Sequence, residues 1–385
     1  MTIDPQATLD HFRGQLDTVI SAVMALVDLE SPSGDVERSR AVTKAVEEMF
    51  IDAVPSIGIE RVEAAGYGTH LVLSIGATAT GSFMILGHTD TVHPVGTRSK
   101  NPTRIENGLV YGCGIFDMKA NIVLLAEALK YLSASGEPGA AGIKILLSCD
   151  EEVGSPTGRD LVERIAGGAA SCLVLEPSAD GKAKTGRKGT GMFSLSAHGI
   201  PAHSGLEPEK GSSAVVELAR QIDRVQAISD LALGTTVNVT TFHGGSASNV
   251  IAEHATCEID VRFENSSEAA RVTKELSELT PFDARNRLEL SGEINRPPLE
   301  RTDAVARAFD RARKLTAGLG YDLGETKVGG ASDGNFVAAL GVPVLDGLGV
   351  RGSGAHTLDE HIFADDIPYR AALFAMLIAD AAERA

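Results

Sequence analysis

The chain has 385 residues, a formal net charge of −17 at pH 7 and 43% hydrophobic residues. Its length exceeds what one hydrophobic core usually serves, so we expect two domains, and 41 glycines suit an α/β protein with many tight turns. The negative charge argues against a nucleic-acid partner, because no basic stretch could neutralise a phosphate backbone.

In chain order, the N-terminal residues MTIDPQATLD have no basic region followed by an apolar one, so no signal peptide is expected. Apolar residues then recur at helical spacing over 7–29, and a second helix is predicted at 37–50 after the polar stretch SPSGD. A further helical segment, MKANIVLLAEALKYL, lies among short apolar runs with strand character, which are LVLSI (71–75), FMILG (83–87), IKILLSC (143–149) and SCLVLE (171–176). This alternation predicts an α/β fold with a mostly parallel sheet and helices on both faces. No run of about 20 apolar residues predicts a membrane span.

The pattern changes after about residue 185. The next predicted elements are a strand, a helix, two strands, a helix and a strand, at 192–198, 211–228, 236–242, 255–263, 266–279 and 287–291. The order β-α-β-β-α-β is typical of a ferredoxin-like α+β module. Pro297 and Pro298 mark a boundary, after which helices at 301–317 and from about 366 resume the first pattern. We therefore expect a discontinuous domain, 1–184 plus 298–385, interrupted by an inserted lid domain at 185–297.

Residues that can bind metals follow several of the predicted strands. In open α/β sheets, ligands bind beyond the carboxyl ends of the strands, so these residues should converge. Mixed imidazole and carboxylate ligands without paired cysteines suit zinc, with manganese or cobalt as substitutes. The residues are His88 and Asp90 after FMILG, Asp150, Glu151 and Glu152 after IKILLSC, Glu176 after SCLVL, Asp117 at the end of YGCGIFD, and His356 after a glycine-rich loop.

Two of these patterns have a mechanical rationale. Residues two apart in an extended chain face the same way, so Asp90 can accept a hydrogen bond from the distal nitrogen of a metal-bound His88. Adjacent Glu151 and Glu152 should point apart, so that one can bind metal while the other addresses a water. Each pattern alone has a plainer explanation, a hydrogen-bonded surface turn or an acidic helix start. A dication that offsets the repulsion between the acids explains them together.

Seven segments, spread in order over nearly the whole chain, resemble the di-zinc peptidase family. That family includes glutamate carboxypeptidase (carboxypeptidase G), acetylornithine deacetylase, succinyl-diaminopimelate desuccinylase and aminoacylase, and the resemblance is closest to the glutamate carboxypeptidase branch. The segments are GHTDTV (87–92), GCGIFDMKA (112–120), SCDEEVGS (148–155), LEPS (175–178), PAHSG (201–205), GGASDGN (329–335) and GSGAHTLDE (352–360).

The resemblance implies two zinc ions per chain, replaceable by cobalt or manganese, with Asp117 as the bridging ligand. It implies that Glu151 is the general base and that Asp90 orients His88. The implied ligands are His88, Asp117 and Glu176 for one ion, and Asp117, Glu152 and His356 for the other.

For the lid, the resemblance implies a homodimer in which His203 reaches the neighbouring protomer's active site and polarises the scissile carbonyl. Asn249 and Arg262 match residues that hold the substrate's carboxylate. The simpler alternatives are a loop histidine with internal hydrogen bonds for His203 and a surface salt bridge for Arg262.

The function that the resemblance implies is metal-dependent hydrolysis of an amide bond in a small peptide or N-acyl amino acid, with release of an amino acid. An N-acyl-amino-acid deacylase with the same machinery stays open. A non-catalytic metal-dependent binding protein is disfavoured because pure binding needs no base such as Glu151, and a serine hydrolase because no GxSxG elbow is present. GCGIFD begins like a dinucleotide fingerprint but has Asp117 at its sixth position. Four scattered cysteines without CxxC spacing predict reduced thiols and a cytoplasmic location.

Overall fold

The computed structural model describes residues 3–76, 81–136 and 142–384. The chain divides into two compact units. Unit 1 comprises Met1–Gly186, Arg301–Lys327 and Ser332–Ala385, and unit 2 comprises Arg187–Glu300 and Val328–Ala331. The return of the chain to unit 2 at Val328, where its carbonyl accepts the Lys188 N–H at 3.1 Å, is a feature that the sequence did not predict.

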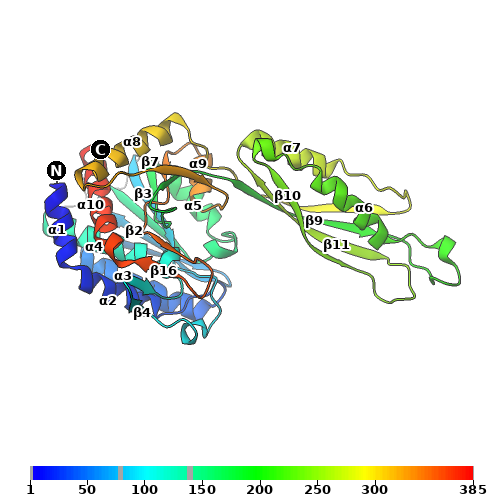
Figure 1. The fold of residues 1–385 in the computed structure, drawn as a ribbon, viewed down its shortest axis with the longest axis horizontal. Helices are drawn as coiled ribbons and strands as arrows, with labels where there is room; N and C mark the ends of the chain where they lie inside the picture. Colours follow the sequence, from blue (N-terminus) through cyan, green and yellow to red (C-terminus); the bar gives the residue numbers. More distant parts are fainter. Residues whose placement is uncertain (1–2, 77–80, 137–141, 385) are drawn as a thin grey trace. The chain divides into compact units, whose positions relative to one another are not determined.

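A mixed sheet forms the centre of unit 1 (Figure 1). Its strands β6, β3, β7 and β14 run parallel, whereas β2 is antiparallel to both β6 and β1. Strand β1 was not predicted. Most of its residues are exposed or only partly buried, so its sequence shows no regular alternation of apolar and polar residues. In spatial order the strands are β1 (Gly58–Ala64), β2 (Gly68–Ile75), β6 (Ile143–Ser148), β3 (Ser82–His88), β7 (Ala169–Val174) and β14 (Val344–Leu345).

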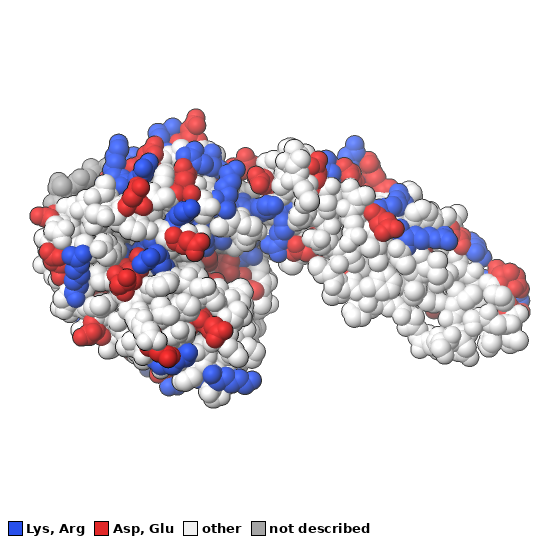
Figure 2. Space-filling view, viewed as in Figure 1, with Lys and Arg blue, Asp and Glu red and all other residues white. Residues whose placement is uncertain are grey.

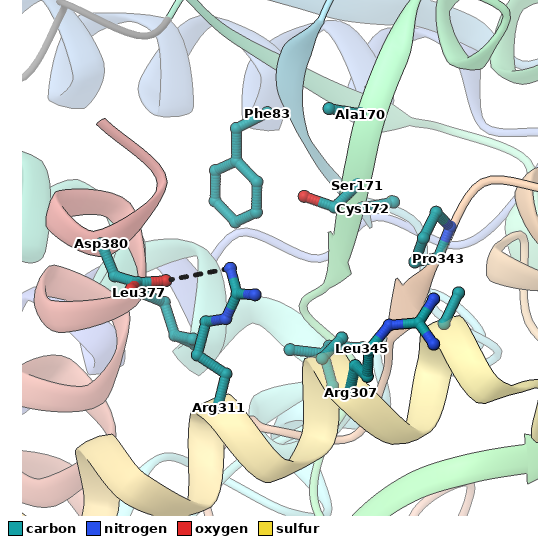
Figure 3. Close-up of a pocket in the computed structure, with 12 residues that line it drawn as sticks. Phe83, Ala170, Ser171, Cys172, Arg307, Arg311, Pro343, Leu345, Leu377 and Asp380 are labelled. Atoms are coloured by element: carbon teal, nitrogen blue, oxygen red, sulfur yellow. Dashed lines mark ion pairs between the residues drawn. The ribbon is translucent and has the colours of Figure 1, made fainter. Parts of the chain in front are cut away.

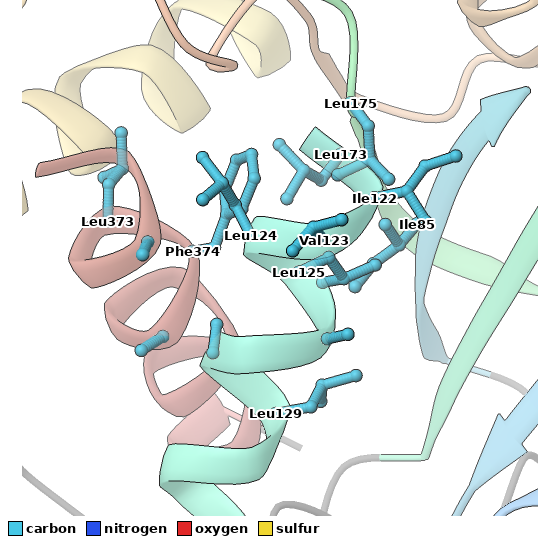
Figure 4. Packing of buried hydrophobic residues seen from close by; sticks show 14 of the residues in the cluster. Ile85, Ile122, Val123, Leu124, Leu125, Leu129, Leu173, Leu175, Leu373 and Phe374 are labelled. Carbon is cyan, nitrogen blue, oxygen red and sulfur yellow. The ribbon is translucent and has the colours of Figure 1, made fainter. Parts of the chain in front are cut away.

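Helices pack on this sheet through alternate strand residues. Figure 4 shows α4 (Ala120–Ala134) lying between the β3 and β7 side chains on one side and α10 (Ile367–Arg384) on the other. Ile85, Leu125 and Phe374 of this layer are fully buried. Successive strand residues face opposite sides, so Val174 faces a second layer, where Gly334 of α9 (Gly334–Ala339) lies against it. The helices α5 (Arg159–Ala166) and α9 both contact β7.

The helix predicted over 7–29 is in fact two helices, α1 (Pro5–Gly14) and α2 (Leu16–Val27). The chain leaves helical geometry at Gln15, with φ −102° and ψ 4°. Apolar periodicity reports which side chains are buried, and Leu9 and Val23 of the two helices do join one core, so the break was invisible in the pattern. The following helix, α3 (Val36–Ala53), is capped by Asp35, which accepts the Arg38 N–H.

A smaller antiparallel sheet brings two distant segments of unit 1 together. Strand β5 pairs with β4 on one side and with β16 on the other, and β16 also pairs with β15. The segment before α4 is thereby joined to the segment near residue 360. The strands are β4 (Arg104–Glu106), β5 (Leu109–Tyr111), β15 (Gly352–Ser353) and β16 (His361–Phe363). Unit 1 also contains α8 (Asp303–Gly318). It holds all but the last residue of each strand in the pair β8 (Ala183–Arg187) and β13 (Glu325–Val328).

Unit 2 consists of an antiparallel sheet with strand order β10-β11-β9-β12 and two helices. Its own hydrophobic core joins Leu195 and Val261 of the sheet to Leu218 and Val272 of the helices. Strands β10 and β12 form the two edges of the sheet. Along the chain the elements are β9 (Gly189–His198), α6 (Ala214–Gln226), β10 (Thr236–Gly244), β11 (His254–Phe263), α7 (Ser266–Ser277) and β12 (Arg287–Arg296).

The surface charges are mixed rather than segregated. Figure 2 shows basic and acidic side chains interspersed over the visible face of unit 1. All four cysteines lie within the described residues, where they are free and buried. Among the helices of the described ranges, none has both the length and the apolar character needed to cross a bilayer.

Candidate metal centre

The strand ends of unit 1 bring the predicted ligands to one edge of its sheet. His88 is the last residue of β3, and Glu176 follows the end of β7. Glu152 lies in the turn Glu151–Val153 that follows β6. Because β6, β3 and β7 are parallel neighbours, their carboxyl ends meet at the same edge. Asp117 reaches this edge from the turn before α4, where its backbone is non-helical and its peptide bond to Met118 is cis.

Two groups of predicted ligands overlap at Asp117. His88 Nε2 lies 3.2 Å from Asp117 Oδ1 and 3.6 Å from Glu176 Oε1. His356 Nε2 lies 3.5 Å from Asp117 Oδ2 and 3.2 Å from Glu152 Oε2. Each oxygen of the Asp117 carboxylate therefore faces a different histidine, which is the arrangement of a bridging carboxylate. In addition, three possible ligand atoms, one each from His88, Asp117 and Glu152, all lie within 4.8 Å of one another.

These distances fit divalent cations. Ligand atoms about 2.1 Å from a tetrahedral zinc lie roughly 3.4 Å from one another, and the N···O separations here are 3.2–3.6 Å. Glu152 Oε1 is buried and has no hydrogen-bond partner within the described residues. A buried carboxylate oxygen without a partner is costly, and a cation would satisfy it. The donor set, imidazole nitrogens with carboxylate oxygens, suits zinc, cobalt or manganese.

The pKa shifts of the ionisable groups indicate that this centre favours positive charge. Burial lowers the pKa of His88, but the surrounding carboxylates, Asp117 foremost, raise it well above its usual range. Hydrogen bonds to Asp117 and Glu152 raise the pKa of His356 to about 10. Burial raises the pKa of Glu152 and opposes ionisation of Asp117, whose pKa the two histidines nevertheless lower. Protons on the imidazoles thus balance the carboxylates, and a cation binding the same atoms would displace them.

Asp90 connects His88 to the turn that carries the two glutamates. The hydrogen bond of His88 Nδ1 is to the Asp90 backbone oxygen at 3.0 Å, and the Asp90 carboxylate is farther away at 3.4 Å. That carboxylate accepts the backbone N–H groups of Glu151 and Glu152 at 3.2 and 3.1 Å, and the Ser33 hydroxyl at 2.6 Å. The contact between His88 and Asp90 was predicted for the carboxylate, whereas the backbone oxygen makes the hydrogen bond and the carboxylate holds the turn of the two glutamates, which the sequence did not reveal.

The two adjacent glutamates lie in the turn that follows β6. The Glu152 side chain is only 6% exposed and meets His356. Glu151 is partly exposed. The backbone N–H groups of both residues are held by the Asp90 carboxylate.

His203, Asn249 and Arg262, which were predicted to lie in a lid, belong to unit 2. His203 Nδ1 accepts the backbone N–H groups of Gly205 and Leu206 at 3.1 and 3.2 Å, so its neutral ring carries the proton on Nε2. The Asn249 backbone oxygen accepts the Ser204 N–H at 3.0 Å, which places these two loops side by side.

Arg262 forms an ion pair along its own strand. Its Nη2 and Nε lie 2.8 and 3.0 Å from the two carboxylate oxygens of Asp260. This is the salt bridge that the sequence raised as the simpler alternative for Arg262. Its Nη1 atom has no partner within the described part of the chain.

Other residues near the centre carried no sequence signal. Lys184 Nζ lies 3.6 Å from Glu176 Oε2 and places a cation beside that ligand. The Met118 sulfur accepts the His88 N–H at 3.3 Å. Ser33, whose hydroxyl donates to Asp90, lies in a polar stretch from which the sequence predicted only the end of a helix. No spacing rule joins residues so far apart in the chain, so these contacts require the folded structure.

A cavity of about 200 Å³ lies elsewhere in unit 1 (Figure 3). Phe83 and Ala170 line it near the amino-terminal ends of β3 and β7, opposite to the end of β3 that carries His88. At its edge, Arg311 lies 3.9 Å from Asp380. The cavity is therefore separate from the metal centre.

Comparison with known proteins gives matches over most of the chain. The model of "Peptidase family M20/M25/M40" matches residues 84–380. Carboxypeptidase G2 of Pseudomonas sp. (strain RS-16) is 30% identical over 373 residues, which cover 94% of this chain and 89% of that protein. A succinyl-diaminopimelate desuccinylase of Cereibacter sphaeroides is 31% identical over 331 residues, covering 78% and 84% of the two chains. The crystal structure of the aminopeptidase PepT of Bacillus cereus superposes with a TM-score of 0.77 at 22% identity, covering 95% of this chain and 99% of that chain, which shows a common fold.

Proposed function

The chain belongs to peptidase family M20/M25/M40 as a metal-dependent hydrolase, and from that premise we propose that it works in the manner of a glutamate carboxypeptidase. It cleaves the amide that joins an acyl or peptidyl group to an amino acid and releases that amino acid. The observation that carries the proposal is the pair of ligand groups that share Asp117. Similarity to carboxypeptidase G2 over 94% of the chain supports this branch of the family.

The proposed centre holds two divalent cations per chain, zinc or its substitutes cobalt and manganese. Bound there, the cations supply Lewis acidity toward the scissile carbonyl and lower the pKa of a water toward neutrality. The proposed ligands are His88, Asp117 and Glu176 for one ion, and Asp117, Glu152 and His356 for the other.

Glu151 is the proposed general base. It accepts a proton from the attacking water and delivers that proton to the leaving amine. Its position supports this role, because Asp90 holds its backbone N–H in the same turn as Glu152, whose side chain meets His356.

His203 is the proposed hydrogen-bond donor to the carbonyl oxygen as that oxygen gains negative charge. The two backbone N–H groups on its Nδ1 support this role, since they leave the proton of the neutral ring on Nε2. Asn249 and Arg262 are proposed to bind the carboxylate of the leaving amino acid. Arg262 would do so through Nη1, because Asp260 already occupies Nε and Nη2.

We also propose that unit 2 is a lid that joins two chains into a homodimer, with His203 acting in the partner's site. The edge strands β10 and β12 support this, since an exposed sheet edge is protected when it pairs across a two-fold axis. Four free and buried cysteines support a reducing compartment, the cytoplasm.

A second candidate is an N-acyl-amino-acid deacylase, favoured by the 31% identity to a succinyl-diaminopimelate desuccinylase. The machinery would be the same and only the acyl pocket would differ.

A substrate panel separates the two candidates. Zinc-loaded protein would be assayed against N-benzoyl and N-aminobenzoyl glutamate, dipeptides, and N-acetyl and N-succinyl amino acids, with Glu151→Gln as the control for contaminating activity. The carboxypeptidase proposal expects the highest kcat/KM with aromatic acyl or peptidyl amino acids. Preference for N-acetyl or N-succinyl compounds would select the deacylase, and absence of amide hydrolysis throughout would reject both.

A further inference from the structure

A buried glutamate that belongs to neither ligand group lies directly behind the bridging aspartate. Glu360 is fully buried, with 0% exposure. Its Oε1 accepts the backbone N–H groups of Phe116 and Asp117 at 2.9 and 3.0 Å. Its Oε2 accepts the Gly114 N–H at 2.8 Å and lies 2.6 Å from Nε2 of His93, which is also buried. Both carboxylate oxygens are thus engaged.

These contacts hold the turn from which Asp117 projects. The Asp117 backbone has φ −118° and ψ 91° within an otherwise helix-like turn, so no regular helical hydrogen bonding fixes its direction. Its two oxygens must nevertheless face His88 and His356 at 3.2 and 3.5 Å. The hydrogen bonds from the N–H groups of Gly114, Phe116 and Asp117 to Glu360 supply this constraint on the amino-terminal side of the Asp117 side chain.

Glu360 also belongs to the loop that carries the other histidine. It follows His356 by four positions and directly precedes β16, whose first residue pairs with Tyr111 of β5. The Glu360 backbone oxygen accepts the Gly112 N–H at 3.2 Å. One residue therefore ties the segment of the bridging ligand to the segment of His356 through both its backbone and its side chain.

The buried carboxylate of Glu360 is satisfied where it lies. A buried carboxylate is tolerated when it is hydrogen-bonded. Three backbone N–H groups and the His93 ring surround this one. If an amide replaced this carboxylate, its NH₂ group would face backbone N–H groups. The backbone hydrogen bonds to one of the two carboxylate oxygens would then be lost.

We propose that Glu360, supported by His93, is a positioning residue that sets the direction of the bridging Asp117 carboxylate and couples it to the His356 loop. This inference rests on the proposed two-metal centre. It assigns Glu360 no contact with substrate or cation. Loss of Glu360 should affect most strongly the ion held by Asp117, Glu152 and His356, called the second ion below, because Asp117 and His356 lie on the two segments that Glu360 joins.

The test compares Glu360→Gln and His93→Gln with Glu217→Gln in the full chain. Glu217 is a matched control, since its buried carboxylate accepts the Phe282 and Asp283 N–H groups at 2.9 and 3.0 Å in unit 2. Zinc stoichiometry and affinity would be measured by competition with a chromophoric chelator. The visible absorption of the cobalt-loaded proteins would report ligand geometry, and thermal unfolding of the metal-free proteins would report folding.

Outer partners of metal ligands typically contribute ten- to hundredfold to metal affinity. We expect Glu360→Gln to weaken the second ion by about that factor, with a smaller change in the first, and to alter the cobalt spectrum. His93→Gln should weaken affinity for the second ion by less than about tenfold and alter the cobalt spectrum in the same direction. This variant provides the test if Glu360→Gln does not fold. Glu217→Gln should leave both unchanged.

Two results would overturn the inference in distinguishable ways. If the wild-type chain binds two ions and the Glu360 and His93 variants bind them with unchanged affinity and spectrum, Glu360 is a structural residue alone, whatever happens to stability. If the wild-type chain binds no second ion, the two-metal centre itself fails and the inference fails with it.

Discussion

The division of labour between Glu151 and Glu152 can be tested by making the same substitution at adjacent positions. Glu152→Gln keeps the volume of the side chain but removes the charge of a carboxylate that meets His356 Nε2 at 3.2 Å. The side chain is 6% exposed and its other oxygen has no partner within the described residues, so solvent cannot substitute for the lost ligand. Glu151→Gln makes the same change beside it and should spare the ligands.

The expected magnitudes differ in kind. Losing an outer partner of a ligand costs about ten- to hundredfold in metal affinity. Losing a ligand should weaken binding of the second ion by at least the same factor, which corresponds to about 1.4–2.7 kcal/mol of binding free energy or more. Glu151→Gln should leave metal affinity within about twofold of wild type and lower kcat by about 10²–10⁴, the range for a general base. Equilibrium dialysis with elemental analysis measures the first quantity, and steady-state rates at saturating zinc measure the second.

A specific pattern of results would refute this reasoning. If both variants lost the second ion equally, Glu151 would be a ligand and the proposed division of roles between the two glutamates would be wrong. If Glu152→Gln kept both ions at wild-type affinity, its contact with His356 would be only a hydrogen bond.

Three further predictions follow from the same structure. A chelator should abolish activity, and zinc, cobalt or manganese should restore it; full activity in protein shown to be metal-free would contradict the proposed mechanism. The metal-free protein should become less stable as pH rises from 6.5 through the raised pKa of His356, near 10, because the stabilising protonated ring is lost. The expected loss of unfolding free energy is about 1–2 kcal/mol, after allowance for solvent screening of the half-exposed ring. Denaturation of His356→Gln across this range should lack that loss, and an identical pH slope in both proteins would exclude His356 as its source. Mixing His203→Ala with Glu151→Gln protein should form hybrid dimers with one intact composite site and measurable activity; demonstrated subunit exchange without recovery would show that His203 does not act in the partner's site.

The sequence predicted the core elements of both units because their burial leaves a strong pattern. The fully buried run at 83–87 became β3, and the alternating run at 255–263 lies within β11. Where burial and backbone geometry diverge, the pattern failed. The helix over 7–29 broke at Gln15 while its apolar stripe continued, and β1 left almost no signal because it lies exposed at an edge.

For the candidate site, the sequence by itself determined which chemistry stands at the strand ends. Imidazoles and carboxylates placed directly after apolar runs predict metal ligands, since parallel strands deliver their carboxyl ends to one edge. That argument depends only on residue type and local order, both of which are written in the chain. It therefore holds without knowledge of any contact.

The tertiary structure alone decided how these residues are divided and held. Only folding could show that the two oxygens of Asp117 face different histidines, that Lys184 lies beside Glu176, or that Glu360 holds the turn of Asp117 from more than two hundred positions away. Such contacts arise from the packing of segments distant in sequence, and their directions are set by hydrogen bonds of about 3 Å that no local periodicity encodes. Residue types specify what a site can bind, whereas the packed backbone specifies which atoms meet.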